Sequence, residues 1–232
     1  MNTIKESSSL KKIIHNITSF TTVDYEDHLS CIIWFVRCNM RCQYCYNPDI
    51  VNSKSGLYTK EDVLEFLKKR VGLLDAVVLS GGEPTIHDLE VFCKEIKLLG
   101  YKIKLDTNGS NPKQLEHLIK EQLVDYVAID FKSLKEKFEN ITKSNFYEKF
   151  IKSLKILNVS KIEYEVRTTL HNDLLSVEDI NIMQDILLKN GYKNSYFIQN
   201  FLEVENIANI KSSKKSLDIS KLSDKLNIVF RN

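Results

Sequence analysis

Short runs of apolar residues alternate along the chain with longer amphipathic stretches. Six runs have the length and composition of buried strands, and they cover residues 30–36, 75–79, 102–105, 126–129, 162–168 and 195–198. Helix signals lie between them and predict helices from Thr59, over 88–99, from Pro112, over about 145–157 and over 177–189. Strands that alternate with helices form parallel βαβ units. We therefore expect an α/β protein, a partial (β/α)6 TIM-like barrel with parallel strands.

The two ends of the chain have weaker patterns. Residues 1–29 read as an extended lead-in with a hairpin around residues 24–27, and residues 203–232 read as a C-terminal extension. Within that extension we expect a surface helix over residues 211–225 and a short edge strand over residues 227–230. Neither end differs enough in composition to indicate a second domain, so residues 1–232 are expected to form a single domain.

Composition and charge narrow the class of protein. The 232 residues are 43% hydrophobic and 28% charged, which is ordinary for a globular chain. The net charge of +2 predicts no affinity for nucleic acid, and the chain has no run of eighteen apolar residues that would span a membrane. The first residues lack the apolar core of a signal peptide, so a cytoplasmic location is expected.

Three cysteines, Cys38, Cys42 and Cys45, lie within eight residues directly after the first predicted strand. They are too close for unstrained disulfides among themselves, and soft thiolates of this kind select zinc, copper(I) or an iron–sulfur cluster. A site with three protein ligands leaves one position open, which is typical of chemistry rather than scaffolding. The remaining Cys31 and Cys93 are too few for a second four-cysteine cluster and are expected in the core.

Polar, turn-forming segments follow each of the first four predicted strands. They are the cysteine loop and residues 80–84, 106–109 and 130–132. Functional groups of parallel α/β barrels cluster at the carboxyl ends of the strands, so these segments predict one active site. Gly81 and Gly82 would let the backbone approach a ligand closely, and Glu83 could accept a hydrogen bond from an ammonium group. The alternative is a tight strand-to-helix turn with a capping acid.

The cysteine loop resembles the cluster loop of the radical S-adenosylmethionine enzymes. The shared features are the Cys-x3-Cys-x2-Cys spacing and an aromatic residue, Tyr44, before the last cysteine. The resemblance implies that the cysteines hold three irons of a [4Fe-4S] cluster, while S-adenosylmethionine chelates the fourth iron. It also implies reductive cleavage of S-adenosylmethionine to a radical that abstracts hydrogen from the substrate. A second segment is similar to the family's glycine-rich motif, which contacts the cofactor's amino group: Gly81, Gly82, Glu83 and Pro84.

Two further segments look like those of the glycyl-radical-enzyme activases, a subgroup of the same superfamily. One contains Asp106, Thr107 and Asn108, and the other contains Asp130 and Lys132. The resemblance implies that the two aspartates help to bind the cofactor and a monovalent cation, and that Lys132 reaches the cofactor carboxylate. The residues alone leave an alternative, in which Asp130 caps a helix and Lys132 is a solvated charge.

Arg167 is a charged residue inside the apolar run 162–168. It points either into the barrel mouth, where it would pair with a carboxylate of cofactor or protein, or outward on a half-exposed strand. Gln199 and Asn200 follow the sixth strand, where related activases often place a histidine, and either amide could substitute for it.

The most specific resemblance is to activating proteins of the anaerobic ribonucleoside-triphosphate reductase. It rests on residues 19–24, the cysteine loop and residues 106–109. It implies a backbone glycine of a large partner enzyme as substrate, and a flavodoxin- or ferredoxin-type electron donor. Related sequences usually carry Pro-Gly near position 26 and a glycine before the first cluster cysteine, where this chain has Glu26, Asp27 and Arg37. These departures affect the backbone rather than the ligands.

Two other functions are compatible with the sequence. A radical enzyme of this size could act on a small molecule, in the manner of a carboxy-deazaguanine synthase-like enzyme. A non-enzymatic protein could hold zinc or a cluster at the thiolates. The latter function leaves the three other polar segments without a role.

Overall fold

The computed structural model describes residues 11–231, which form two compact units. The first unit contains the chain up to Asn39 together with Asp49–Thr107 and His117–Val127. The second unit contains Met40–Pro48, Asn108–Glu116 and the chain from Ala128 onward. The expectation of a single domain stays a prediction.

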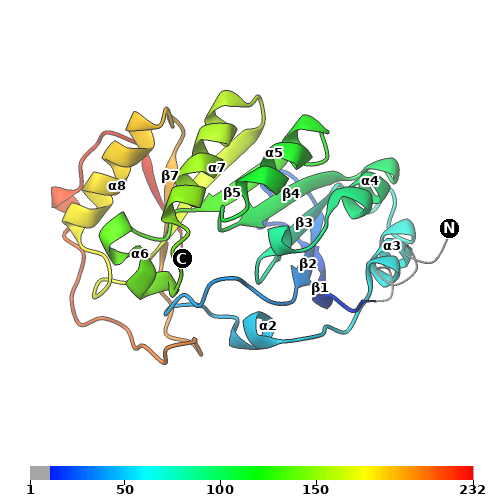
Figure 1. Cartoon of the computed structure of the whole chain (residues 1–232), viewed down its shortest axis with the longest axis horizontal. Coiled ribbons are helices and arrows are strands. Elements are labelled where there is room, and N and C mark those ends of the chain that lie inside the picture. Colours follow the sequence, from blue (N-terminus) through cyan, green and yellow to red (C-terminus); the bar gives the residue numbers. More distant parts are fainter. Residues whose placement is uncertain (1–10, 232) are drawn as a thin grey trace. The chain divides into compact units, whose positions relative to one another are not determined.

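The described strands form one sheet in which each strand follows its predecessor in the sequence (Figure 1). Their bounds are Ile14–Thr21 (β1), Ser30–Phe35 (β2), Ala76–Gly81 (β3), Lys102–Thr107 (β4), Tyr126–Asp130 (β5), Glu163–Leu170 (β6), Tyr196–Asn200 (β7) and Ile228–Arg231 (β8). β1 is antiparallel to β2, whereas β2–β3, β3–β4, β6–β7 and β7–β8 are parallel. The strand order begins with β1 and ends with β8, so the sheet is open. The predicted α/β class with parallel strands is confirmed, and β2 to β7 follow the order of a partial (β/α)6 barrel.

The helices alternate with these strands. Their bounds are Pro48–Asn52 (α2), Lys60–Lys68 (α3), Glu90–Leu98 (α4), Pro112–Lys120 (α5), Lys135–Thr142 (α6), Tyr147–Val159 (α7) and Val177–Lys189 (α8), with 3-10 turns at Pro84–Ile86 (η1) and Ile219–Lys221 (η2). α3 and α8 begin with capping boxes, in which Thr59 and Ser176 each exchange hydrogen bonds with an aspartate three residues on. α2 and α6 have only 5 and 8 residues, too few for a helical period to stand out in the sequence.

The helix predicted over residues 211–225 is wrong, whereas the edge strand predicted beyond it is confirmed as β8. Apart from η2, the segment is irregular. Side chains there bind nearby backbone N–H groups: Asp218 accepts from Ser220 N at 3.3 Å, and Ser213 Oγ accepts from Lys215 N at 3.0 Å. Local bonds of this kind favour turns over helix.

The core of the first unit forms around strands that are buried on both faces. Ala76 through Leu79 are fully buried, as is typical of parallel strands with continuous apolar runs. The turn between β1 and β2 packs on the sheet, because Tyr25 joins Ile32 and Val78 in one hydrophobic cluster. The hairpin predicted in the lead-in is therefore confirmed and is anchored to the core.

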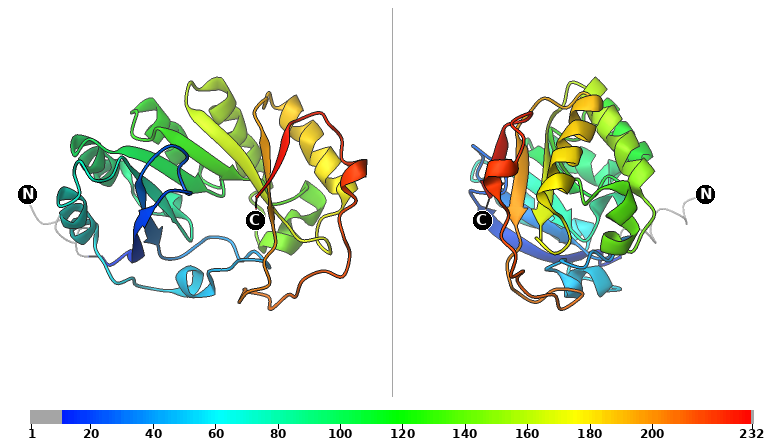
Figure 2. Two further views of the ribbon diagram at one scale, coloured as in Figure 1. Left: turned by 180° about the vertical axis from the view of Figure 1, so that it is seen from behind. Right: turned by 90° about the vertical axis from the view of Figure 1, so that its left-hand side faces the viewer.

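The strands β6 and β7 of the second unit have two different faces. One face carries alternate buried residues, namely Val166, Thr168, Tyr196 and Ile198. Figure 2 shows α7 and α8 on one side of these strands. Because successive side chains of a strand point to opposite faces, Glu165 and Arg167 lie on the other face of β6. The second unit thus presents a charged sheet face opposite its apolar one.

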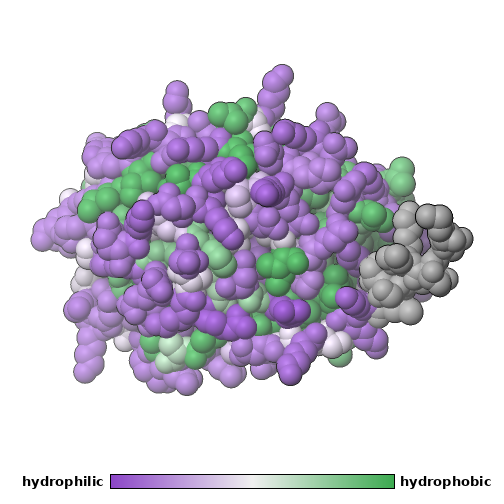
Figure 3. Space-filling model, in the orientation of Figure 1, coloured by the Kyte–Doolittle hydropathy of each residue, from purple (hydrophilic) through white to green (hydrophobic). Residues whose placement is uncertain are grey.

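The described part of the chain contains no helix that is long and apolar enough to cross a membrane. The face of the molecule in Figure 3 is mostly hydrophilic, with separate hydrophobic areas between the polar side chains. Scattered apolar side chains are normal on protein surfaces.

Five described residues other than glycine adopt the left-handed conformation that favours glycine. Two of them lie near the cysteine loop or the first hairpin: Asp27, with φ of 60°, and Arg37, with φ of 67°. The resemblance described above leads us to expect glycine near the first position and at the second. The left-handed backbone at both residues fits that expectation, and the side chains present here are strained by it.

We expect Arg37→Gly to stabilise the protein. A left-handed conformation costs a non-glycine residue roughly 1–2 kcal/mol, whereas glycine loses about 0.5–1 kcal/mol more conformational entropy on folding. The free energy of unfolding of the metal-free protein should rise by up to about 1 kcal/mol in urea titrations. Arg37→Ala is the control, because it removes the side chain and keeps the strain. Equal stabilities of the alanine and glycine variants would contradict this account.

Candidate active site

The cysteine loop is held in place by backbone hydrogen bonds on two sides. Arg41 N and Gln43 N donate to the carbonyls of Thr142 and Ile141 at the end of α6, at 2.8 and 2.9 Å. On the other side, Ile207 N donates to Cys45 O, and Ala208 N donates to Gln43 O, both at 3.1 Å. The side chain of Gln43 adds a further bond, with Nε2 donating to Asn140 O at 2.9 Å. The loop from residue 41 to residue 45 is therefore tied to α6 and to residues 207–208, mainly through its backbone.

The three predicted ligands are free thiols with different exposure. Cys42 is buried, and Cys38 and Cys45 are half-buried. Burial raises the pKa of the Cys42 thiol to about 11, against the opposing charge of Lys132. Cys38 belongs to the first unit and the other two cysteines to the second. Among residues 11–231, no three His, Cys, Asp or Glu side chains are grouped closely enough to hold a metal ion, so the three-cysteine ligand set stays a prediction.

The other two cysteines are core residues, as expected. Cys31 in β2 and Cys93 in α4 are completely buried, and burial raises the pKa of each thiol to about 12. His87 also has a structural role, because its Nε2 contacts the carbonyl oxygen of Val36 at 2.8 Å.

Gly81 and Gly82 allow a close approach of one backbone segment to another. Gly81 has φ of 115°, and a Cβ atom on Gly82 would lie 1.9 Å from the carbonyl oxygen of Arg37. Gly82 N donates to Phe35 O, and Glu83 N donates to Arg37 O, both at 2.9 Å. The two glycines therefore leave room for the backbone that leads into Cys38. We expected them to leave room for a ligand instead.

Glu83 is buried and serves the turn. Its Oε1 accepts hydrogen bonds from Thr85 N at 3.1 Å and from Thr107 Oγ1 at 2.7 Å, and the side chain caps η1, where Pro84 is the first residue. These are the features of the alternative interpretation, a tight turn with a capping acid. A cofactor contact for residues 81–84 stays a prediction.

Asp106 and Thr107 are the last two residues of β4, which is two residues longer than the predicted strand, and Asn108 follows them. Their side chains bond to other protein groups. Asp106 accepts from Ser80 Oγ at 3.1 Å, and its other oxygen lies 3.7 Å from Lys104 Nζ. Thr107 donates to Glu83, and Asn108 Oδ1 accepts from Ser110 N at 2.9 Å. The first unit therefore brings Glu83, Thr107 and the end of β3 together.

Asp130 at the end of β5 lies between two cations. Lys132 Nζ donates to Asp130 Oδ2 at 3.1 Å, and Arg167 Nε donates to Asp130 Oδ1 at 3.0 Å. The side chains of Lys132 and Arg167 are only 14% and 13% exposed, so Lys132 is not a solvated charge. The residue that precedes α6 as its N-cap is Leu134, so Asp130 does not cap that helix. Arg167 pairs with a protein carboxylate, which was one of its two expected orientations.

The charges of this group stabilise one another. Burial by itself would raise the pKa of Asp130, but Arg167 and Lys132 outweigh burial and lower it below the ordinary value of 3.8. Burial opposes the charge on Lys132, yet Asp130 raises the pKa of Lys132 well above its ordinary value. All three side chains therefore remain charged at neutral pH, and the group has a net charge of +1.

Tyr44 lies beside this group. Its ring centroid is 5.9 Å from Lys132 Nζ, within the range of a cation–π contact. The hydroxyl oxygen is buried and has no hydrogen-bond partner among the described residues. A buried hydroxyl usually has a partner, so this one fits a site that receives a polar group from a ligand.

Sequence reasoning did not single out Glu165 and Arg231. Arg231 donates two hydrogen bonds to Glu165, at 3.2 and 2.9 Å, and Arg167 Nη1 lies 4.0 Å from the same carboxylate. The only signal in the sequence is that Glu165 and Arg167 are two residues apart on one strand. His171, directly after β6, is buried, with Nε2 donating to Lys211 O at 2.8 Å.

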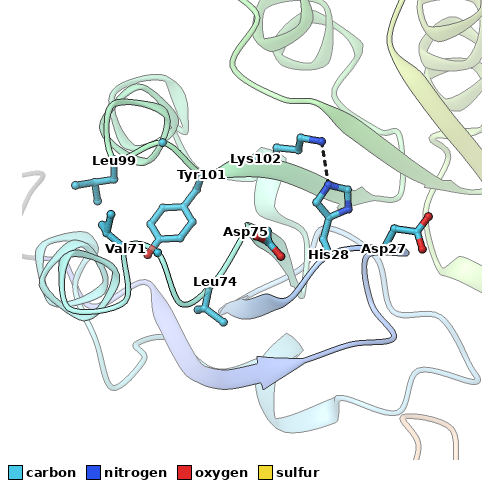
Figure 4. A pocket seen from close by; sticks show the side chains of 10 residues that line it. Asp27, His28, Val71, Leu74, Asp75, Leu99, Tyr101 and Lys102 are labelled. Atoms are coloured by element: carbon cyan, nitrogen blue, oxygen red, sulfur yellow. Dashed lines mark hydrogen bonds between the residues drawn. The ribbon is translucent and has the colours of Figure 1, made fainter.

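A cavity of about 590 Å³ lies elsewhere in the first unit (Figure 4). Its lining includes Asp75 and Lys102, at the amino ends of β3 and β4, and His28, whose Nε2 is 3.0 Å from Lys102 Nζ. At about 3.3 Å per residue, these strands separate the cavity by roughly 20 Å from their carboxyl ends. The cavity therefore contains none of the predicted site residues.

The fold and the polar segments together define the protein as an α/β protein with an open sheet and a candidate ligand site at the strand ends. Polar segments lie at the carboxyl ends of β2, β3, β4 and β5, and the first of these segments carries three cysteines that form no disulfide. Ligand sites of parallel α/β proteins lie at such strand ends.

Comparison with known proteins gives the family. The model of the Radical SAM superfamily matches residues 32–186, and the chain belongs to this superfamily. A provisionally named glycyl-radical enzyme activating enzyme of Methanocaldococcus jannaschii is 35% identical over 202 residues, which are 83% of this chain and 81% of that protein. The pyruvate formate-lyase-activating enzyme of Clostridium pasteurianum is 32% identical over 129 residues, 51% of this chain and 52% of that protein.

Solved structures share the fold. Streptococcus suis SuiB bound to S-adenosylmethionine has a TM-score of 0.68 and 18% identity, over 87% of this chain and 52% of that one. The chain thus spans about half the length of SuiB and of the clostridial enzyme. Membership of the superfamily implies S-adenosylmethionine and a [4Fe-4S] cluster as cofactors.

We expect Gly82→Ala to impair cluster assembly. The new Cβ would collide with the Arg37 carbonyl, so the backbone before Cys38 must shift. Iron content after anaerobic reconstitution should fall well below that of the wild type, and stability should drop by about 1–3 kcal/mol. Gly72→Ala is the matched control, because Gly72 has φ of 79° with open space around it. If both variants retain full iron content, the packing role of Gly82 is refuted.

We expect Asp130→Asn to lower the free energy of unfolding by about 3 kcal/mol at neutral pH, because it leaves two buried cations together. A carboxyl group with a depressed folded pKa stabilises the protein above its unfolded pKa, and this stabilisation disappears as the pH falls through the folded pKa. The difference between wild type and variant should therefore shrink between about pH 5 and pH 2 in urea titrations of the metal-free protein. Asp185→Asn, which breaks an exposed pair with Lys225, should cost at most about 1 kcal/mol. A pH-independent difference would argue against the ion pairs.

Proposed function

We propose that this protein cleaves S-adenosylmethionine reductively at a [4Fe-4S] cluster and generates a glycyl radical on a large partner enzyme, the anaerobic ribonucleoside-triphosphate reductase. The observation that carries the proposal is the group formed by buried Tyr44 and half-buried Asp130, Lys132 and Arg167, in the same unit as Cys42 and Cys45. A net positive, partly enclosed group beside a thiol loop suits a ligand that carries a carboxylate.

The donor set fits the cluster. Cys38, Cys42 and Cys45 supply three soft ligands and would hold three irons, with one iron left for the cofactor. When bound, the reduced cluster supplies the electron for cleavage of S-adenosylmethionine. The protein fixes the ligand loop through the backbone bonds to α6 and to residues 207–208.

The second unit offers groups for the cofactor's polar end. Lys132 and Arg167 can attract a carboxylate, because together they exceed the single charge of Asp130. The buried Tyr44 hydroxyl can exchange a hydrogen bond with the ligand. A monovalent cation at Asp130 would stand beside two cationic side chains, so we do not include it in the proposal.

The partner and the electron donor rest on the relatives. The 35% identical archaeal relative is named as an activating enzyme of a glycyl-radical enzyme. The ribonucleotide reductase is the partner that residues 19–24 and the cysteine loop favour by resemblance. A flavodoxin- or ferredoxin-type protein would supply the electron, and the proposed location is the cytoplasm, where reducing conditions keep thiols available as ligands.

The proposal is tested by anaerobic incubation of the reconstituted, reduced protein with S-adenosylmethionine and the candidate partner. We expect 5′-deoxyadenosine and the electron paramagnetic resonance signal of a glycyl radical on the partner. Deoxyadenosine without a partner radical would reject the activase function and favour a small-molecule substrate. A protein that binds iron but never cleaves the cofactor would be a non-enzymatic metal protein.

We expect Ser substitution of Cys38, Cys42 or Cys45 to abolish cofactor cleavage and to reduce the iron bound per chain. A hydroxyl is a poor ligand for iron compared with a thiolate. Cys93→Ala is the matched control, since this thiol is buried in α4 and should leave both measurements near wild type. Full cleavage activity in any of the three loop variants would remove that cysteine from the ligand set.

A further inference from the structure

Five charged side chains of alternating sign form a continuous series in the second unit. The order is Arg231, Glu165, Arg167, Asp130 and Lys132, from the C-terminal strand β8 through β6 to the end of β5. The separations of successive charged atoms are 2.9, 4.0, 3.0 and 3.1 Å. The series contains three cations and two anions, so its net charge is +1.

The arrangement of β7 explains how Arg231 reaches Glu165. β7 lies between β6 and β8, and Phe197 of β7 is the register partner of Arg167. The guanidinium carbon of Arg231 lies 3.7 Å from the Phe197 ring centroid, so the side chain crosses β7 stacked on the aromatic ring. It then meets Glu165, whose side chain is only 4% exposed, with two parallel hydrogen bonds.

Arg167 has carboxylates on two sides. Its Nε donates to Asp130 at 3.0 Å, and its Nη1 lies 4.0 Å from Glu165. A buried carboxylate that loses one cationic partner is left uncompensated, so its attraction to the remaining cations becomes more important. If Arg231 did not neutralise Glu165, Glu165 would compete with Asp130 for Arg167.

We infer that Arg231 is a positioning residue for the cofactor site. By neutralising Glu165 it keeps Arg167 on Asp130, and so keeps the Arg167–Asp130–Lys132 group arranged for a ligand carboxylate. This inference rests on the proposed function for the identity of the ligand. It gives the C-terminal strand, outside the residues matched by the family model, a role in the chemistry.

The first test is binding of S-adenosylmethionine to the reconstituted, oxidised protein, measured by equilibrium dialysis. Arg231→Gln should weaken binding about tenfold, the size of a lost charge-assisted interaction. The double variant Glu165→Gln, Arg231→Gln should bind within about twofold of wild type, because residue 165 is then neutral and no longer competes with Asp130 for Arg167. Arg231→Lys should retain most of the affinity. Lys225→Gln, a change at an exposed ion pair in the same segment, is the control and should bind normally.

The second test needs no cofactor. In the metal-free protein, the melting temperature changes of Arg231→Gln and Asp130→Asn should be non-additive, because the two residues belong to one charge series. Additive changes, or a double Gln variant that binds as weakly as Arg231→Gln, would overturn the inference. Failure of the wild type to bind S-adenosylmethionine would instead overturn the proposed function, and the melting experiment would still decide the role of Arg231.

Discussion

The second unit depends on one buried carboxylate that is held between two cations. Asp130 accepts from Lys132 and Arg167, and all three side chains are largely shielded from water. Burying such charges is costly unless each one finds a partner, so the position of each side chain is fixed by the other two. The group carries one more positive than negative charge, and Arg167 also lies 4.0 Å from the Glu165 carboxylate. We propose that this net positive charge attracts an anionic group of a ligand.

The cysteine loop has a different construction, because backbone hydrogen bonds to two other segments hold it. The end of α6 and residues 207–208 supply hydrogen bonds to the part of the loop that carries Cys42 and Cys45. In the first unit, Gly82 lets the chain before Cys38 approach the end of β3 closely. These hydrogen bonds come from backbone groups, so they hold the loop without using the thiols that we propose as metal ligands.

The sequence predicts the order of strands well because parallel strands buried on both faces are continuous apolar runs. The sequence also predicts the candidate ligands, because three cysteines within eight residues can be recognised without knowing the fold. Ion partners far apart in sequence are not visible in this way: Arg231 is 66 residues from Glu165 and lies in a short edge strand. The irregular segment 211–225 failed as a helix because its serines and aspartate bind nearby backbone groups, which periodicity does not register.

The C-terminal thirty residues have too little apolar character to be recognised as part of a core, yet they complete the second unit at two points. Residues 207 and 208 hold the cysteine loop by their backbone N–H groups, and Arg231 neutralises Glu165. The first contact comes from an irregular segment, and the second from the short apolar strand β8, whose pairing with β7 places Arg231 beside Phe197. A charged site needs individual donors at fixed positions, and here a short edge strand and an irregular segment supply them.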